Sequence, residues 1–395
     1  MFDLIFVQIH DGEESMRANK SLAILGTRGI PACHGGFETF AERLALHLTQ
    51  RGWDVTVYCQ GDSALGNRVD DSWRGVHRIV LPVKREGAAG TIEFDWACVR
   101  DAVKMQPGVA LTLGYNTAIF CVWMRLLGVK NVINMDGLEW RRDKWRPHER
   151  AWLWLNERIG CLVGNHLIAD HPAIADHLAT RVRRTKISTI TYGADRIEKA
   201  NEKLLGDLSL SPYNYGILIG RPEPENSILD VVRAFSQRKR NAKLVVLGKY
   251  EPTKHKYHRE IMDSAGSEVL FPGAVYDTET LRSLRFHARF YLHGHKVGGT
   301  NPSLVEALGA GNAVIAHDNV FNRWVAGVGA RYFSSQSQCA DHIGELLADD
   351  ADLAKMRASS IERFSNMFEW SGILEEYEGL LVQYCRPETA PAATL

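Results

Sequence analysis

The sequence predicts an α/β protein built from two doubly wound domains that face each other across a cleft. Short apolar runs alternate with amphipathic stretches from residue 21 to about 190, the alternation lapses in a charged stretch, and a second alternation follows. Strands that are separated by helices form a parallel sheet with helices on both faces. The chain of 395 residues is long enough for two domains, because single hydrophobic cores stop growing near about 250–300 residues.

The predicted strands are short apolar segments. In the first domain they are SLAILG, DVTVYC, HRIVLP, GVALTL, NVINMD, HLIAD and KISTITY. In the second domain they are YGILIG, AKLVVLG, EVLF, ARFYLHG and NAVIAHD. Helical patterns lie between them, as in FETFAERLALHLTQRG, where Phe37, Phe40, Leu44 and Leu48 recur on one helix face. After Ser334 the pattern is helical almost to the end of the chain.

The break between the two alternations predicts the domain boundaries. The segment GADRIEKANEKLLGDLSLSPYN, from Gly193, is charged and has no strong period, which is typical of a linker. We expect a first domain at 1–195, a linker at 196–213, a second domain at 214–365, a final helix at 366–385 and an unstructured tail at 386–395. Doubly wound domains bind ligands in the crevice beyond the carboxyl ends of their strands.

Composition and charge argue against several classes of protein. The formal net charge is +0, which argues against broad electrostatic binding of nucleic acid. No apolar run approaches the ~20 residues that a membrane-spanning helix needs. The segment MFDLIFVQIHDGEES is too short and too acidic for a signal peptide, and Met16 is an alternative start. Because the 7 cysteines form no C-x-x-C pair, we expect reduced thiols in a cytoplasmic protein.

A glycine-rich loop follows the first predicted strand. The segment GTRGIPACHGG, from Gly26, permits a sharp turn, and Gly35 and Gly36 then open a helix. Free N–H groups at a helix start favour an anion. The spacing matches neither the G-x-G-x-x-G dinucleotide fingerprint nor a G-x-x-x-x-G-K-[ST] phosphate loop. A tight strand-to-helix connection without a ligand is the alternative interpretation.

An arginine ends the first strand of the second domain. Arg221, in GRPEPENS, follows YGILIG, so it lies at the edge of the sheet where ligands bind. A guanidinium there suits bidentate binding of phosphate. The alternative is a surface arginine that pairs with Glu223 or Glu225.

A strong helix start lies farther along the second domain. Thr300 or Asn301 suits the helix cap, and Pro302 suits the first turn. Gly299 and its neighbour leave the helix terminus open to a diphosphate. Glu306 follows about one turn inside the helix, where a carboxylate suits the vicinal hydroxyls of a ribose. A solvated helix glutamate is the alternative.

Two carboxylates follow the strand NVINMD in the first domain. Asp136 and Glu139 are expected at the crevice, where they orient hydroxyls or act as a base. The continuation through RAWLWLNERIGCLVG is rich in tryptophan and arginine, a composition that suits contact with a membrane surface. Trp152 and Leu155 fit an ordinary core more readily. The D-x-D run that begins at Asp350 resembles a metal motif but lies at a helix boundary, so we interpret it as capping.

The segments GTRGIP, HGGFETFAE, NMDGLEWRR, GRPEPEN and GGTNPSLVEALGAGNAVIAHD together resemble the retaining glycosyltransferases of family 4, which have the GT-B fold. They look like the branch that contains bacterial rhamnosyltransferases. The resemblance extends from about Ser21 to the last helix. It implies that the first domain faces the acceptor, that the second holds the nucleotide sugar, and that the final helices cross back to the first.

The resemblance also implies roles for single residues. Arg221 would bind the donor diphosphate, Glu306 the ribose, and the backbone at Val275 the nucleobase. Two positions depart from the family pattern. Asn226 is the nearest equivalent of a lysine that usually follows the arginine, and Gly298 replaces a glutamate that usually contacts the donor sugar.

The expected site residues therefore fall into three groups. The donor-binding residues are Gly35, Gly36, Arg221, Asn226, Val275, Gly299, Thr300, Asn301 and Glu306. The acceptor-side residues are Asp136 and Glu139. The residues expected to take part in catalysis are Asp136, Arg221 and Glu306.

The implied reaction moves a sugar from a nucleoside diphosphate to a hydroxyl with retention of the anomeric configuration. Arg221 and the helix start near Asn301 supply positive charge for the leaving diphosphate, so we expect no metal ion and no other cofactor. We expect dTDP-L-rhamnose as donor and a saccharide, free or linked to polyprenyl diphosphate, as acceptor in cell-surface polysaccharide synthesis. We expect no nucleic-acid partner, and a cytoplasmic protein with peripheral contact to the inner face of the cell membrane.

Three other functions stay open at this point. A nucleotide-sugar epimerase of the same fold would use water in place of the acceptor. An NAD-dependent oxidoreductase would use similar sheets, although its fingerprint is missing. A binding module without activity is compatible with Gly298.

Overall fold

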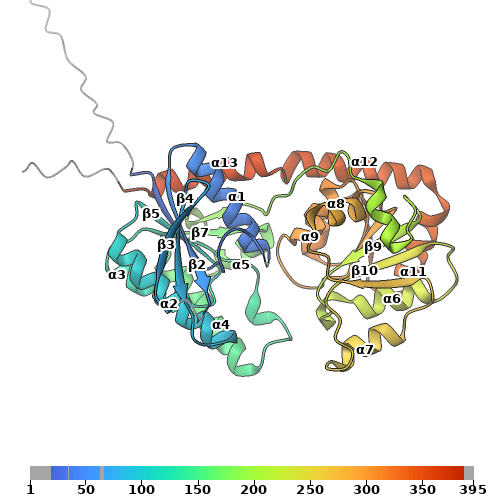
Figure 1. The fold of residues 1–395 in the computed structure, drawn as a ribbon, viewed down its shortest axis with the longest axis horizontal. Coiled ribbons are helices and arrows are strands. Elements are labelled where there is room, and N and C mark those ends of the chain that lie inside the picture. Colours follow the sequence, from blue (N-terminus) through green and yellow to red (C-terminus); the bar gives the residue numbers. More distant parts are fainter. Residues whose placement is uncertain (1–18, 34, 63–65, 387–395) are drawn as a thin grey trace, which may run out of the picture.

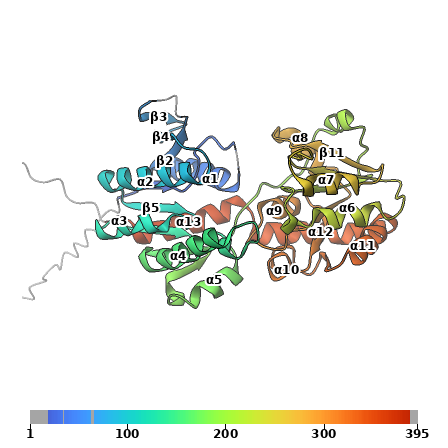
Figure 2. The same cartoon turned by 90° about the horizontal axis from the view of Figure 1, so that it is seen from below.

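The computed structural model describes residues 19–33, 35–62 and 66–386, which form two α/β units side by side (Figures 1 and 2). We call these the first unit and the second unit. Within the described residues, the first unit has an eight-stranded sheet and the second a six-stranded sheet. The prediction of two doubly wound bodies is therefore confirmed. Met16 and the predicted tail beyond Arg386 lie outside the described residues.

The sheet of the first unit has the strand order β3-β4-β2-β1-β5-β6-β7-β8. Its strands are β1 (Ser21–Leu25), β2 (Asp54–Gly61), β3 (Val69–Trp73), β4 (Val76–Pro82), β5 (Val109–Leu113), β6 (Asn131–Asn134), β7 (His166–Ala169) and β8 (Ile187–Thr189). Its helices are α1 (Gly36–Gln50), α2 (Gly87–Met105), α3 (Cys121–Leu126), α4 (Pro147–Val163) and α5 (Pro172–Ala179). The strand order reverses between the parallel neighbours β1 and β5, so ligands are expected at that point.

The sheet of the second unit has the order β11-β10-β9-β12-β13-β14, with parallel pairing throughout its described strands. The strands are β9 (Tyr215–Ile219), β10 (Lys243–Leu247), β11 (Val269–Gly273), β12 (Phe290–His293), β13 (Ala313–His317) and β14 (Arg331–Phe333). The helices are α6 (Ile228–Ser236), α7 (Lys256–Asp263), α8 (Thr278–Phe286), α9 (Pro302–Gly309), α10 (Val320–Ala326), α11 (Gln336–Ala348) and α12 (Asp350–Met367). Here the strand order reverses between β9 and β12.

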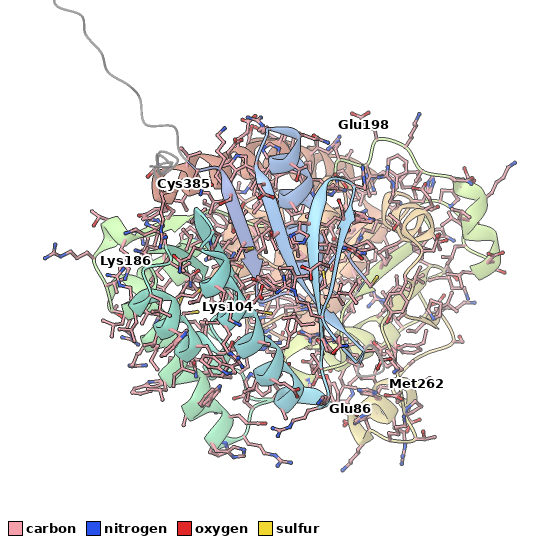
Figure 3. All side chains as sticks on the ribbon, turned by 60° about the vertical axis from the view of Figure 1, so that its left-hand side comes forward. Glu86, Lys104, Lys186, Glu198, Met262 and Cys385 are labelled. Carbon is pink, nitrogen blue, oxygen red and sulfur yellow. The ribbon has the colours of Figure 1, made fainter. Side chains whose placement is uncertain are left out.

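The linker between the units carries a short 3₁₀ helix, η5 (Glu202–Leu208). Apolar side chains cover both faces of each sheet, and side chains fill the space between sheets and helices (Figure 3). In α1, Phe40, Leu44 and Leu48 are buried as the helical period predicts, whereas Phe37 is only half-buried at the edge of the same cluster.

The last helix, α13 (Trp370–Tyr384), returns to the first unit. Trp370, Tyr377 and Leu381 pack into the same apolar cluster as Phe40 and Leu44 of α1. By contrast, α12 packs on the second unit (Figure 1). The expectation that the chain crosses back at its end is therefore confirmed.

Two strands were not predicted from the sequence. β3 (VDDSW) is an exposed edge strand that pairs antiparallel with β4 through a turn at Arg74 and Gly75, both of which have positive φ. Its two consecutive aspartates break the alternation of apolar and polar residues by which a half-buried strand is recognised. β14 has three residues, which is too short for a pattern.

The expectation that Trp152 and Leu155 belong to the core is wrong. Their side chains on α4 are 37% and 42% exposed. They are among the exposed apolar side chains of α3, of the residue after it and of α4, and we call this set the α3–α4 face; its members are Trp123, Leu126, Leu127, Trp152, Trp154, Leu155 and Leu162. Apolar residues occur on two sides of α4. The side with Leu153 and Cys161 packs into the core, and the side with Trp152 and Leu155 does not.

Candidate functional site

A cleft of about 1400 Å³ separates the two units. Its walls include the segments that follow β1 and β5 in the first unit and β9 and β12 in the second. These are the points at which the strand order of each sheet reverses, where parallel α/β sheets bind ligands. The cleft is therefore the candidate active site.

The cleft brings together almost all the residues singled out from the sequence. The lining residues among them are Gly35, Gly36, Asp136, Glu139, Arg221, Val275, Gly299, Thr300, Asn301 and Glu306. Asn226 is buried behind the cleft wall and does not line it. Its side-chain amide donates to the carbonyl oxygen of Arg221 over 2.8 Å. Asn226 therefore holds the backbone at Arg221 in this structure.

The glycine-rich loop of the first unit folds back onto α1. The amide of Ala32 donates to the Glu42 carboxylate over 2.7 Å, and the amide of Arg28 donates to Glu38 over 3.4 Å. A Cβ atom on Gly36 would lie 3.1 Å from Cγ of Pro302 in the second unit. Glycine at this position therefore permits the close approach of the two units across the cleft.

The start of α9 has the predicted cap. The Asn301 side chain accepts from the amide and hydroxyl of Ser303 over 3.1 and 2.8 Å, and Pro302 occupies the first turn. Among the described residues, the amides of Gly298, Gly299 and Asn301 have no hydrogen-bond acceptor. Unpaired amides at a helix N-terminus form an anion site.

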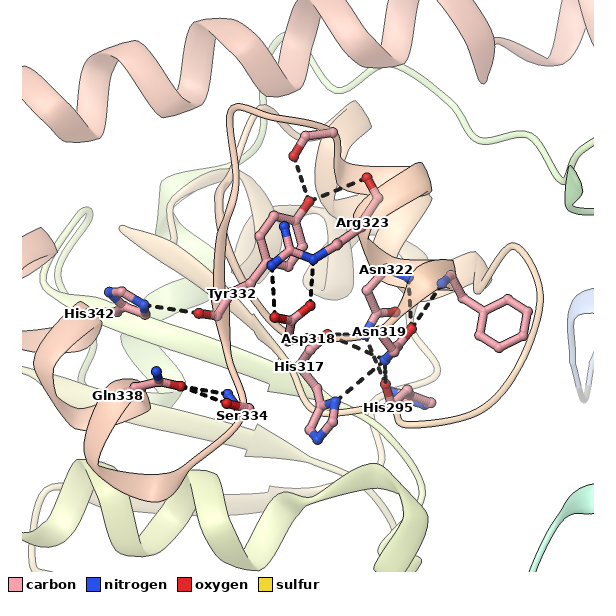
Figure 4. A network of polar contacts seen from close by, with 12 residues as sticks. His295, His317, Asp318, Asn319, Asn322, Arg323, Tyr332, Ser334, Gln338 and His342 are labelled. Carbon is pink, nitrogen blue, oxygen red and sulfur yellow. Dashed lines mark hydrogen bonds and ion pairs between the residues drawn. The ribbon is translucent and has the colours of Figure 1, made fainter. Parts of the chain in front are cut away.

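The loop that leads to this helix is held from behind. The side-chain amides of Asn319 and Asn322 donate to the carbonyl oxygen of His295 over 2.9 and 2.8 Å (Figure 4). The His295 ring stacks on His293 with 4.3 Å between centroids. Burial and the nearby charge of Arg221 lower the pKa of His295 to about 3. The imidazole is therefore neutral at physiological pH.

Arg221 presents a free guanidinium to the cleft. The residue is exposed, and within the described part of the chain its side chain makes no ion pair or hydrogen bond. The alternative pairing with Glu225 is wrong, because Glu225 accepts from Nε of Arg142 in the first unit over 2.9 Å. Arg221 is therefore available for an anionic ligand.

Glu306 lines the cleft but has a partner. It forms an ion pair with Arg285 of α8, a cation that also lines the cleft and whose side chain is nearly buried. The carboxylate is thus held in place rather than solvated, and Arg285 adds positive charge to the same wall.

The two carboxylates after β6 differ in environment. Glu139 accepts from Arg142 over 2.6 Å and lies 3.7 Å from Nζ of Lys144, so its charge is balanced. Asp136 has no such cation within hydrogen-bond reach among the described residues. Burial, together with Glu139 and Asp170, raises the pKa of Asp136 to about 7.

The charged residues of the cleft that were not found from the sequence include Arg142, Asp170, Lys249 and Arg285. Asp170 directly follows β7, and Lys249 comes shortly after β10. Ligands bind beyond the carboxyl ends of parallel strands, so a search for polar residues at the end of every predicted strand would have found both. Arg142 and Arg285 lie in a loop and a helix, and no sequence signal marks them.

The D-x-D run lies at the start of a helix as expected, but its aspartates occupy the first turn and pair with Arg289 and Arg331, and the cap is the residue before them. Asp349 caps α12 by accepting from the amides of Ala351 and Asp352, both over 2.9 Å. No group of three or more histidine, cysteine or acidic residues suited to a metal ion occurs within 19–33, 35–62 and 66–386. In the same ranges, no helix is long and apolar enough to cross a membrane.

A family model described as a domain of unknown function, DUF1972, matches residues 19–195. This range corresponds to the first unit. A comparison with curated proteins found no match.

The solved structures show close similarity of fold over almost the whole chain. Sucrose-phosphate synthase from Thermosynechococcus elongatus is 16% identical with a TM-score of 0.78, over 92% of this chain and 98% of that one. HepE from Anabaena, solved with UDP and glucose, is 15% identical with a TM-score of 0.73, over 92% and 99%. An α,α-trehalose-phosphate synthase (UDP-forming) from Burkholderia vietnamiensis is 11% identical with a TM-score of 0.72, over 92% and 100%. The chain therefore has the GT-B fold.

Proposed function

We propose that this protein is a glycosyltransferase that takes its sugar from a nucleoside diphosphate. The observation that carries the proposal is that one cleft holds both a free guanidinium and a helix start that still has unpaired amides. Arg221 and the unpaired amides near Asn301 both belong to the second unit and both line the cleft. A diphosphate suits these groups, because guanidinium and helix amides bind its oxygens at separate points.

The similar structures support this choice of ligand. HepE from Anabaena was solved with UDP and with UDP-glucose, and the trehalose-phosphate synthase is named as UDP-forming. These enzymes share the fold and nearly the full length of this chain. A nucleotide sugar is accordingly the donor class that we propose.

We propose a reaction in which the positive groups of the cleft stabilise the leaving group. As the bond between the anomeric carbon and the phosphate oxygen breaks, negative charge develops on the diphosphate, and Arg221 and the α9 amides stabilise it. The acceptor hydroxyl attacks from the same face, a new carbon–oxygen bond forms, and the proton passes to the leaving phosphate oxygen. We propose retention of configuration on this basis, with Asp136 positioning the acceptor and no metal ion required.

We propose dTDP-L-rhamnose as the donor and a saccharide, free or lipid-linked, as the acceptor. Gly298 lines the cleft where the family pattern has a glutamate, and its φ of +142° suits glycine. A transfer assay that compares dTDP-rhamnose, UDP-glucose, UDP-N-acetylglucosamine and GDP-mannose, with and without EDTA, tests the donor and the metal together. Preference for one of the last three would overturn the rhamnose assignment, and activity that is lost with EDTA and restored by magnesium would overturn metal independence.

The anomeric configuration of the product and the need for an acceptor separate the remaining alternatives. Proton NMR of the product reports retention or inversion directly. Release of nucleoside diphosphate without an acceptor would favour an epimerase. Tight binding of NAD in place of a nucleoside diphosphate would favour an oxidoreductase.

We further propose peripheral contact with an anionic membrane through the α3–α4 face. Leu126 and Leu162 on this face are 71% and 76% exposed. Arg125 lies in the last turn of α3, and the Arg158 guanidinium lies 3.4 Å from the Trp154 ring centroid. Aromatic and basic side chains together suit the interface of a bilayer with acidic lipids.

A further inference from the structure

Asp170 of the first unit forms hydrogen bonds with Thr300 of the second unit. It directly follows β7, and its Oδ2 accepts the backbone amide of Thr300 over 2.9 Å. The Thr300 hydroxyl donates in return to the carbonyl oxygen of Asp170. The two contacts join the end of a first-unit strand to the start of α9 in the second unit.

The other carboxylate oxygen of Asp170 has no partner. Oδ1 is buried and accepts no hydrogen bond from any described residue. A Cβ atom on Gly299 would lie 2.1 Å from it, so only glycine at 299 admits the carboxylate here. An unpaired buried carboxylate oxygen is costly, and such an atom on the wall of a cleft is explained by a ligand that donates to it.

The surroundings of Asp170 identify the kind of donor. The carboxylate has a neighbouring acid in Asp136, and burial raises its own pKa to about 6, so at neutral pH it is mostly ionised and accepts rather than donates. The cations of the cleft that suit a diphosphate, Arg221 and Arg285, belong to the second unit. Asp136 and Asp170 belong to the first unit and line the same cleft, so these two carboxylates are available for groups of the ligand other than the diphosphate.

Hydroxyl groups are the donors that a nucleotide sugar offers beyond its diphosphate. We propose that Asp170 binds a hydroxyl of the transferred sugar through Oδ1 and so contributes a sugar contact from the first unit. The inference rests on the function proposed above. Asp170 and Gly299, beside which Oδ1 lies, both line the cleft. Gly298, which has no side chain, leaves room for the sugar at this point.

The test compares each nucleotide sugar with its bare nucleoside diphosphate. Calorimetry on the full chain gives dissociation constants for dTDP-rhamnose and dTDP, and for UDP-glucose and UDP. Asp170→Asn should lower the affinity for the sugar-bearing ligand about tenfold or more, the scale of one hydrogen bond to a charged group. Affinity for the bare diphosphate should change less than about threefold, because that ligand lacks the hydroxyl. Asp170→Ser gives the same comparison if Asp170→Asn does not fold.

The control removes a different contact between the units. Glu225→Gln weakens the Arg142–Glu225 pair without altering Asp170, so it should not change the ratio of the two affinities. If Asp170→Asn changes both affinities alike, or neither, Asp170 only holds the units together and the inference is wrong. If the wild-type protein binds no nucleoside diphosphate at all, the proposed function fails instead.

Discussion

Arg285 of α8 and Glu306 of α9 form an ion pair on the wall of the cleft. The arginine side chain is 7% exposed and the glutamate side chain 32%. Glu306 is thus fixed before any ligand arrives, which suits a carboxylate that grips hydroxyls of a ribose. The pair also has a structural role, because the nearly buried guanidinium depends on it for its charge balance.

Removal of Glu306 should therefore affect stability as well as activity. Glu306→Ala leaves Arg285 without its partner and should lower the free energy of unfolding by about 1–3 kcal/mol, measured by urea denaturation. The double variant Arg285→Met with Glu306→Ala removes both charges and should lose less than the single variant. Equal stability of Glu306→Ala and the wild type would show that the pair contributes nothing.

Asp136 should support turnover without supporting nucleotide binding. Asp136→Asn keeps the shape and removes the charge, so turnover should fall about tenfold or more, as for loss of a positioned polar group. Affinity for the nucleoside diphosphate should hold, since the cations that bind it belong to the second unit. Normal turnover in this variant would show that the acceptor lies elsewhere.

The same variant has a distinct pH signature. The pKa of Asp136 is raised from 3.8 to about 7 on folding, so between these values the folded protein holds this proton more tightly than the unfolded chain. Its contribution to stability therefore falls as pH rises through this window and stays low above about pH 7. The melting temperature of Asp136→Asn relative to wild type should be higher at pH 8 than at pH 5. A difference that does not vary with pH would contradict the raised pKa.

A larger side chain at Gly36 should keep the units apart. Even a Cβ there lies 3.1 Å from Pro302 across the cleft, and valine adds two methyl groups. We expect Gly36→Val to lower turnover strongly, with Gly36→Ala intermediate and nucleotide affinity less affected. Gly206→Val is the control, because no atom lies within 4 Å of a Cβ built at that glycine. Equal turnover in all three variants would show that the contact between Gly36 and Pro302 is not near the reacting groups.

Much of the site follows from local sequence because parallel sheets gather the ends of their strands. Asp136 and Arg221 were found in this way, and the cap at Asn301 was found from residue types alone. The contacts between the units were not found. Arg142 and Glu225 lie 83 residues apart, and Asp170 and Thr300 lie 130 apart, so no spacing rule relates them.

The same holds for the fold: elements defined by their own residues were predicted, and those that depend on distant parts of the chain were not. Buried strands such as β9 are continuous apolar runs and were predicted. The edge strand β3 depends on its pairing with β4 rather than on its own composition. The exposure of Leu155 depends on which side of α4 the rest of the first unit covers, and the helical period alone does not decide between two apolar sides.

The α3–α4 face should carry the protein to anionic liposomes in a flotation assay. The double variant Trp154→Ser with Leu162→Ser removes two exposed apolar side chains and should reduce the floated fraction several-fold, since binding scales with buried apolar area. Val328→Ser, an exposed apolar position of the second unit, is the control. Wild-type protein that stays out of the lipid fraction would rule out the membrane contact.

The most direct test of the central claim is the affinity of Arg221 variants for a nucleoside diphosphate. Calorimetric titration with dTDP compares the wild type, Arg221→Ala and the control Arg233→Ala, a half-buried α6 arginine that pairs with Glu260 outside the cleft. Loss of charge-assisted bonds worth about 1.5–3 kcal/mol should weaken binding roughly 10- to 150-fold in Arg221→Ala. The melting temperature should hardly change, because this side chain has no partner among the described residues. Unchanged affinity for dTDP in Arg221→Ala, or tighter binding of NAD than of dTDP by the wild type, would contradict a diphosphate site at Arg221.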